Sequence, residues 1–371
     1  MMKKFQIALL MIAAMISAVV LSGCSSSDFV EEIELEEVAI EFSSSTNNAT
    51  RSAINNESDL ATAGGFDVFA YKAKIEGSSV NWSNGWYNVF NGTNVTSTDN
   101  GSNWSYSNTR YWDTTCDYAF YAVAPHNSNT SLVYLEDGAE KSVADYKDKS
   151  DKLSIKIEKV ESGRSTDTKT KDYLITRGAV QRNGSNNTEK VNFEFHHVMS
   201  KVSVNLKAAD GMTGCKITVK EVKMTGWSTQ SCTFIQNSTT VPNNDLSEWH
   251  LPETVSSHNK SGNATFKFGG DDGVTFGKGQ TTETASSADY WIMVPQAIPA
   301  GQLKFTVSYT ITYSDGVVES FTDVECVIPT AQNWWTDCHT TYTLTISPDP
   351  IKFDVTSVSG YGSQSSTVVV Q

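Results

Sequence analysis

Residues 37–51 read EVAIEFSSSTNNATR, and this stretch decides how the rest of the chain is interpreted. The apolar residues Val38, Ile40 and Phe42 alternate with small or charged ones, which is the period of a strand with one buried face. The polar run that follows leads away from this strand and ends at Arg51. We therefore expect a half-buried strand on a polar tether, with a basic target for a protease at the end of the tether.

The last part of the chain repeats this alternation. Ile351, Phe353 and Val355 are separated by Lys352 and Asp354, so a second short strand with an apolar face is expected there. Each strand could fill the place of the other in a neighbouring copy, because their apolar faces have the same spacing. The sequence therefore favours self-assembly.

The chain begins in the way that exported proteins do. Lysines precede an apolar run over residues 7–21, and Leu21-Ser22-Gly23-Cys24 follows. This ending resembles the lipobox of bacterial lipoproteins, which implies a signal peptide over residues 1–23 and a lipid on Cys24. An ordinary secretory signal that contains a cysteine is the alternative. No other apolar stretch approaches the ~18 residues of a membrane-spanning helix.

Composition indicates a folded, acidic protein. Of the 371 residues, 39% are hydrophobic and 11% aromatic, which is enough to fill cores. The formal net charge of -14 argues against a nucleic-acid partner, because phosphate binding needs a positive surface. Residues 28–41 hold a run of carboxylates and no basic residue. We interpret residues 24–51 as an acidic spacer, the first strand and a cleavable propeptide.

The rest of the sequence is all-β in character. Strand-length apolar runs, such as residues 66–71, 118–124 and 303–313, recur between Asn, Gly and Ser turn residues. The polar stretch RNGSNNTE at residues 182–189 separates two such series. We therefore predict two β-sandwich domains in tandem. Their ranges are residues 52–188 and 189–371, and the second includes the donor strand.

Five cysteines remain beside the lipidation site. Because five is odd, at least one has no intramolecular partner. Several share a strand face with apolar neighbours, which favours buried core thiols, although an exported location also permits disulfides. The pairings considered are Cys215–Cys232 and Cys326–Cys338, and neither includes Cys116.

No motif in the sequence indicates catalysis, a metal or a cofactor. His196 and His197 are adjacent, so on a strand they point to opposite faces and do not share a metal ion. Asp271-Asp272-Gly273 offers oxygen ligands for calcium but is more typical of a hairpin turn. We therefore expect a protein that is not an enzyme.

A second hypothesis is a binding module. A surface lipoprotein that does not polymerise could present a sandwich to glycans or host proteins. Four tryptophans could form a sugar-stacking surface, although such residues more often fill a core. They are Trp82, Trp86, Trp104 and Trp112.

The order of several motifs resembles the fimbrillins, the type V pilus subunits of Bacteroidia. The likeness begins with the lipobox and the strand that leads to Arg51, and it continues through most of the chain. The later matching segments are GFDVFAY at 65–71, FYAVAP at 120–125, FHHVMSKV at 195–202 and YTLTI at 342–346.

This resemblance implies a fold, a processing route and a mode of assembly. Both domains would be transthyretin-like sandwiches, and the chain would reach the cell outer membrane as a lipoprotein. An arginine-specific protease would cut between Arg51 and Ser52, release the strand over residues 38–42 and open a groove. Residues 351–355 of another fimbrial subunit would fill that groove, in a fimbrium at the cell surface that contributes to adhesion. A stalk, a tip and an anchor subunit all stay open.

Overall fold

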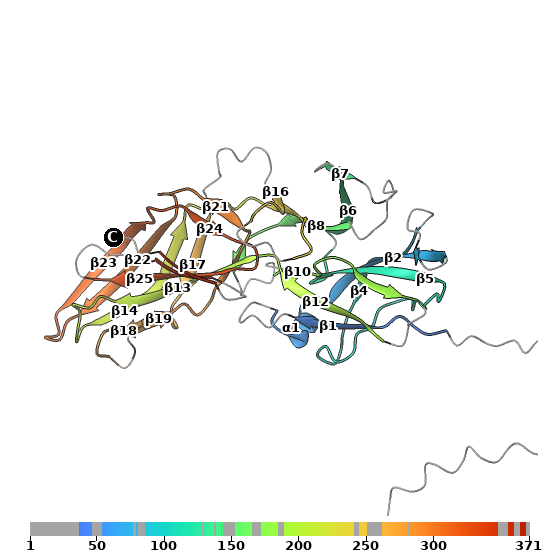
Figure 1. Cartoon of the computed structure of the whole chain (residues 1–371). Helices are drawn as coiled ribbons and strands as arrows, with labels where there is room; N and C mark the ends of the chain where they lie inside the picture. The colour runs from blue at the N-terminus through green and yellow to red at the C-terminus, as the bar shows by residue number, and fades with distance from the viewer. Residues whose placement is uncertain are drawn as a thin grey trace, which may run out of the picture. The chain divides into compact units, whose positions relative to one another are not determined.

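The computed structural model describes most of the chain from Glu37 onward (Figure 1). Contacts divide the chain into Met1–Glu37 and Val38–Gln371, and the second part contains every described helix and strand. The described residues are 37–46, 54–76, 79–80, 86–127, 129–136, 139–141, 143, 153–164, 172–184, 189–240, 245–250, 262–280, 282, 284–347, 355–359 and 364–368.

The described part is almost entirely β-structure, as the sequence predicts, and its one helix is short. Helix α1, Glu57–Thr62, begins after Asn56, whose side-chain oxygen accepts a hydrogen bond from the Asp59 N–H at 2.9 Å. This cap satisfies one of the free N–H groups of the first turn. The buried Leu60 attaches the helix to the core beside the first strand.

The first sheet has eight strands in the order β1-β12-β10-β5-β2-β3, with β11 beside β5 and β4 beside β2. β1 lies at one edge and pairs in parallel with β12, whereas the other pairs in this sheet are antiparallel. The strands are β1 Phe42–Thr46, β2 Phe66–Glu76, β3 Ser79–Val80, β4 Trp86–Val95, β5 Cys116–Ala124, β10 Leu174–Ile175, β11 Val180–Asn183 and β12 Val191–His197.

Two five-stranded sheets face each other later in the chain. One has the order β19-β13-β20-β9 with β25 beside β13, and the other has the order β17-β14-β22-β23 with β18 beside β14. Side chains from both fill one core. The strands are β9 Gly163–Arg164, β13 Ser200–Ala208, β14 Lys216–Thr225, β17 Asn263–Lys267, β18 Val274–Phe276, β19 Thr284–Ser286, β20 Trp291–Met293, β22 Lys304–Thr312, β23 Val318–Val327 and β25 His339–Ile346.

A further five-stranded sheet, β16-β15-β8-β6-β7, and two strand pairs complete the fold. The pairs are β21 with β24 and β26 with β27. The strands are β6 Thr130–Glu136, β7 Ala139–Lys141, β8 Leu153–Val160, β15 Cys232–Ile235, β16 Trp249–His250, β21 Gln296–Ile298, β24 Gln332–Trp334, β26 Val355–Ser359 and β27 Gln364–Val368.

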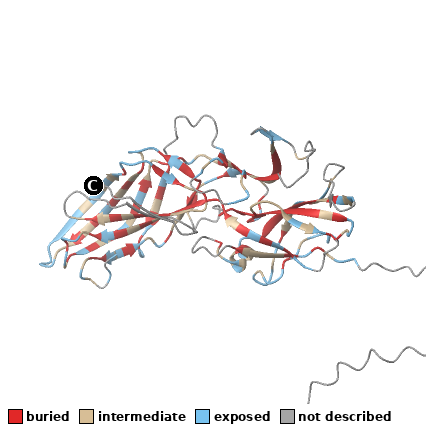
Figure 2. Ribbon diagram, in the orientation of Figure 1, coloured by how far each residue is buried: buried red, intermediate tan, exposed pale blue. Residues whose placement is uncertain are grey.

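The first sheet is covered on both faces. On β2, the side chains of Phe66, Val68 and Ala70 enter one core, while Phe69 and Tyr71 enter another that also contains residues of β6, β8 and β15. β5 divides its side chains between the same two cores, and its buried residues form a nearly continuous run in Figure 2. A strand covered on both faces is apolar throughout, which explains why FYAVAP lacks alternation.

The chain leaves the eight-stranded first sheet after β12 and enters one of the two facing five-stranded sheets at β13. β12 lies beyond the domain boundary predicted at residues 188/189, yet it pairs with β1 and β10 of the first sheet. β8 pairs with β15, and β9 with β20, across the same boundary. The division into two transthyretin-like domains stays a prediction.

A buried ionic cluster lies close to this passage. The guanidinium of Arg177 binds both carboxylate oxygens of Glu248, at 2.7 and 2.8 Å, and both side chains are almost fully buried. Nearby, Nδ1 of His197 lies 3.1 Å from a carboxylate oxygen of Asp172. Burial raises the pKa of Asp337 to about 7, while the neighbouring His197 and Arg177 oppose this rise. The fold therefore buries charged side chains near the point where the chain passes from β12 to β13.

Candidate functional site: the edge strand β1 and its aromatic site

The structure describes only part of the set of functional residues predicted from the sequence. Val38, Ile40 and Phe42 are described, and Val355 begins β26, although its side chain lies outside the described part. The other predicted residues lie outside the described ranges, and their roles stay predictions. They are Cys24, Arg51, Ser52, Ile351 and Phe353.

Backbone hydrogen bonds hold the N-terminal segment against two partners. Residues 38–40 meet residues 110–112, where the Ile40 N–H donates to the Arg110 carbonyl at 2.8 Å and the Trp112 N–H donates to the Val38 carbonyl at 3.0 Å. β1 itself then pairs with β12, from Phe42 opposite Val191 to Thr46 opposite Phe195. The segment is thus attached at a sheet edge, where no further strand of the described chain covers it.

The ring of Phe42 is surrounded by four aromatic rings, which we call the Phe42 site. Phe90, Tyr106, Phe120 and Phe193 supply them, with centroids 5.4, 5.4, 6.2 and 5.6 Å from that of Phe42. Phe42 is 1% exposed. Burial of such a side chain contributes about 1.5–3 kcal/mol, and well-placed ring pairs add about 0.5–1.5 kcal/mol each.

Ile40 enters the same core one step earlier along the strand. Its carbonyl accepts a hydrogen bond at 2.8 Å from the hydroxyl of Tyr106, the residue whose ring also contacts Phe42. Burial raises the pKa of Tyr106, which keeps its hydroxyl protonated as a donor. Ile40 and Phe42 are therefore anchored together by one neighbour.

Two expectations for this stretch were wrong. Val38 is 38% exposed, because the regular ladder with β12 begins only at Phe42 and residue 38 lies at the outer end of the segment. The polar run predicted as a tether also begins later than expected, since residues 43–46 continue β1. Ser43 can occupy a strand because its hydroxyl donates to the Asn192 side chain at 3.1 Å on the polar side of the ladder.

The end of β1 is tied to the start of the next described segment. The hydroxyl of the buried Thr46 donates to the Asn55 carbonyl at 2.9 Å. Residues 47–53 lie outside the described ranges, and both of their flanks are anchored, the later one by the buried Ile54. The predicted cut after Arg51 therefore falls between two fixed points.

The last two described strands pair with each other. β26 pairs antiparallel with β27, from Val355 opposite Val368 to Ser359 opposite Gln364, and β26 lies close to β25. β26 and β27 form a sheet of their own among the described strands. A two-stranded hairpin is marginally stable in water by itself.

Other side chains considered as sites have structural surroundings. The five described cysteines are free thiols, so neither disulfide forms. Cys215 and Cys232 are buried as expected, whereas Cys326 is only partly buried. Trp104 and Trp112 are buried in the core, which removes them from any sugar-stacking surface. Within the described ranges, no cluster of three metal-ligating side chains is found, and no helix is long and apolar enough to span a membrane.

The sequence matches the fimbrillin-like family over residues 50–360, which is most of its length. The chain belongs to the fimbrillin-like family. This confirms the resemblance seen in the order of the motifs. No curated protein sequence matches this fimbrillin-like chain.

The comparison with solved structures finds fimbrial proteins of Bacteroides and Porphyromonas, and the first of those named here has a similar fold. A fimbrial protein from Bacteroides vulgatus is 19% identical with a TM-score of 0.58, over 87% of this chain and 99% of that one. A fimbrial protein from Bacteroides ovatus is 12% identical with a TM-score of 0.33, over 83% and 48% of the two chains. The tip fimbrial protein Mfa3 from Porphyromonas gingivalis is 8% identical with a TM-score of 0.29, over 85% and 98%.

The partners of Phe42 were not recognised from the sequence as parts of a site. Phe90, Phe120 and Phe193 lie in expected strands, and Tyr106 follows Trp104 in a turn-rich region. Nothing in their local sequence distinguishes them from ordinary core residues. Antiparallel pairings from β4 to β12 place the phenylalanines in one core, and the parallel pairing of β1 with β12 adds Phe42 to them.

Proposed function

We propose that this fimbrillin-like chain is a structural subunit of a cell-surface fimbria that polymerises by exchange of its edge strand. A cut after Arg51 would free β1 from the chain, and residues 351–355 of another subunit would take its place. Membership of the fimbrillin-like family supports a fimbrial role. The single observation that carries the exchange is Phe42, a core side chain on an edge strand near the end of the chain.

Removal of β1 would leave an open groove that another strand could fill. The rings of the Phe42 site would be exposed to water, and the edge of β12 would lose its backbone partners. An extended strand restores both, because its backbone completes the ladder and its alternate side chains fill the pocket. This groove selects for strands with apolar residues two positions apart.

The C-terminal segment has the required spacing. Ile351 and Phe353 are two residues apart, as are Ile40 and Phe42, and the order of side chains is the same. A donor that runs parallel to β12 would place Phe353 in the Phe42 site and Ile351 beside Tyr106. The hairpin of β26 and β27 has few strand partners to lose when the donor is withdrawn.

Export and anchoring form the first part of the same proposal. The lipobox-like segment would give a lipid on Cys24, which would hold the uncut chain at the outer membrane until the protease acts. Cleavage between Arg51 and Ser52 would then separate the lipid from the body of the subunit. Assembly would in this way be limited to chains that have reached the cell surface.

A protease experiment tests the proposal. Purified protein is treated with an arginine-specific protease, the new N-terminus is determined by sequencing, and the products are run on SDS gels without boiling. Cutting before Ser52 is expected to give a ladder of SDS-resistant oligomers. Arg51→Ala protein under the same treatment is expected to stay monomeric. A monomer that persists after clean cutting at this position contradicts the proposal.

A further inference from the structure

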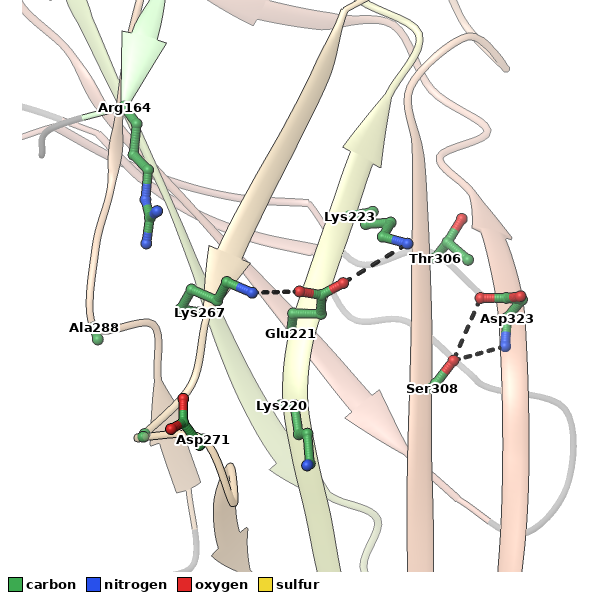
Figure 3. Close-up of a pocket in the computed structure, with 12 residues that line it drawn as sticks. Arg164, Lys220, Glu221, Lys223, Lys267, Asp271, Ala288, Thr306, Ser308 and Asp323 are labelled. Carbon is green, nitrogen blue, oxygen red and sulfur yellow. Dashed lines mark hydrogen bonds and ion pairs between the residues drawn. The ribbon is translucent and has the colours of Figure 1, made fainter. Parts of the chain in front are cut away.

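A polar pocket of about 660 Å³ lies on the outer face of the sheet β17-β14-β22-β23 (Figure 3). Its size falls in the range of small-molecule sites. No residue of β1 lines it, and neither the proposed cut nor the strand exchange involves it. Its lining contains no aromatic and no large aliphatic side chain.

Two β-bulges create this pocket, and both lie opposite Ser308. Between Val219 and Val222, β14 has two residues opposite Ser308, which is one more than a regular ladder allows. On its other side, β23 places Thr322 and Asp323 opposite the same residue. Bulges re-aim side chains, and here they add a residue to the outer face on each side of β22.

Hydrogen bonds fix both bulges. The carbonyl of Lys220 accepts a hydrogen bond from the Phe268 N–H at 2.8 Å, beside the turn that joins β17 to β18. The hydroxyl of Ser308 accepts one from the Asp323 N–H at 2.9 Å. The Gly273 backbone lies so close to this point that a Cβ there would be 2.5 Å from the Val219 carbonyl oxygen. The backbone hydrogen bonds of the sheet therefore fix the shape of the pocket.

The charges in the pocket are incompletely paired. Glu221 is shared by two ammonium groups, those of Lys267 at 2.6 Å and Lys223 at 3.7 Å. Lys220 and Asp271 form no ion pair with any described residue, although both line the pocket. Figure 3 shows the row Lys267, Glu221, Lys223 across the pocket, with Lys220 below it. The pocket thus offers spare positive charge together with carboxylate acceptors.

This combination selects a ligand that carries one negative group and many hydroxyls. A carboxylate fits the spare ammonium groups, and hydroxyls can donate to Asp271 and Asp323. A densely charged polyanion would be repelled by the three carboxylates of the lining, and an apolar ligand would find no aromatic or large aliphatic side chain to pack against. We propose that this pocket binds a carboxylate-bearing saccharide.

The test uses glucuronosyl-xylobiose, a trisaccharide with a single carboxylate, and its methyl ester, each titrated against the uncut protein by saturation-transfer-difference NMR. Binding of the acid but not of the ester is expected, and added salt should weaken it. Because the uncut monomer is used, failure here is distinct from failure of strand exchange. Equal binding of acid and ester, or no binding of either, would overturn the proposal.

Three variants test whether any observed binding takes place in this pocket. Lys220→Met should weaken it about tenfold, because a charge-assisted hydrogen bond is lost. Glu221→Gln should strengthen it, because Lys223 and Lys267 lose their competing carboxylate. Lys304→Met is the matched control, since Lys304 lies on β22 outside the pocket, where it pairs with Glu325. Equal affinities for Lys220→Met and Lys304→Met would contradict the assignment.

Discussion

The ring of Phe42 stacks on that of Phe193, with centroids 5.6 Å apart and planes inclined by 23°. In the ladder, Phe42 lies opposite Val191, so the contact is a diagonal one between neighbouring parallel strands. One ring belongs to the edge strand and the other to the body of the sheet. The stability of the core is thereby linked to the presence of β1.

Phe42→Ala should destabilise the uncut protein by roughly 3–5 kcal/mol, because the four surrounding rings lose their common neighbour. The free energy of unfolding, measured in urea, checks this. Val38→Ala is the matched control on the same segment and should change stability by less than about 0.5 kcal/mol, since Val38 is exposed. Similar losses in both variants would contradict the assigned role of Phe42.

A cut after Arg51 should not by itself release the N-terminal fragment. The ladder with β12 and the burial of Ile40 and Phe42 remain after the peptide bond is broken. In size-exclusion chromatography of cut protein that carries Asp in place of Ile351 and Phe353, and so has no donor strand of its own, the fragment should therefore elute with the body of the protein. A synthetic peptide of residues 349–357 should displace it, and the same peptide with Asp in place of Phe353 should not. Immediate loss of the fragment would show that β1 is weakly held.

Arg177→Met should cost roughly 3–5 kcal/mol, because it leaves the carboxylate of Glu248 buried without its partner. Chemical denaturation measures the effect. The double variant Arg177→Met, Glu248→Met should recover much of the loss, since neither charge is then buried. A double variant as unstable as the single one would mean that shape, and not charge, determines stability at this place.

Asp337→Asn should stabilise the protein at pH 8 and have little effect at pH 4. Burial raises the pKa of Asp337 to about 7, so the folded state holds a proton that the unfolded state has already lost above pH 4. Stability therefore falls as pH rises from about 4 to about 7, and the full penalty, about 2–4 kcal/mol, persists above that range. Asn removes this penalty and tolerates the positive φ of residue 337. Unfolding in urea at both pH values is the measurement.

His197 changes stability in the same direction. Burial lowers the pKa of His197, but the carboxylate of Asp172 outweighs burial and raises it above the usual value. A raised histidine pKa stabilises the folded state fully below the unfolded value, near 6.5, and this contribution is lost as pH rises through the folded value. Asp337→Asn should consequently leave part of the pH dependence in place. A profile that stays as steep as that of the unchanged protein would contradict the role of Asp337.

Local alternation predicted part of the first strand correctly. Ile40 and Phe42 are buried as their spacing requires. The prediction from alternation was wrong at Val38 and over residues 43–46. The limits of the strand there depend on which backbone groups of β12 are available for pairing. A run of serines and threonines shows no alternation of apolar and polar residues. An edge strand can still form there, because it needs only backbone partners and room for small polar side chains.

The aromatic site and the polar pocket could not be predicted from sequence for a related reason. The four rings around Phe42 come from distant parts of the chain, and a parallel pairing of β1 with β12 brings Phe42 to them. The pocket depends on an extra residue in each of two ladders, and no residue type marks such a bulge. Both sites depend on how distant strands are registered against each other. The periodicity of a short segment carries no information about that register.

Strand exchange is tested most directly by mixing two subunits that are each unable to polymerise. One carries Arg51→Ala, so it keeps its own β1 but can still donate its tail. The other keeps Arg51 but carries Asp in place of Ile351 and Phe353, so it can accept a strand but cannot donate one. After protease treatment, each alone should stay monomeric, and the mixture should give an SDS-resistant heterodimer and nothing longer. No heterodimer, or long polymers from either variant alone, would contradict the exchange of β1 for the C-terminal strand.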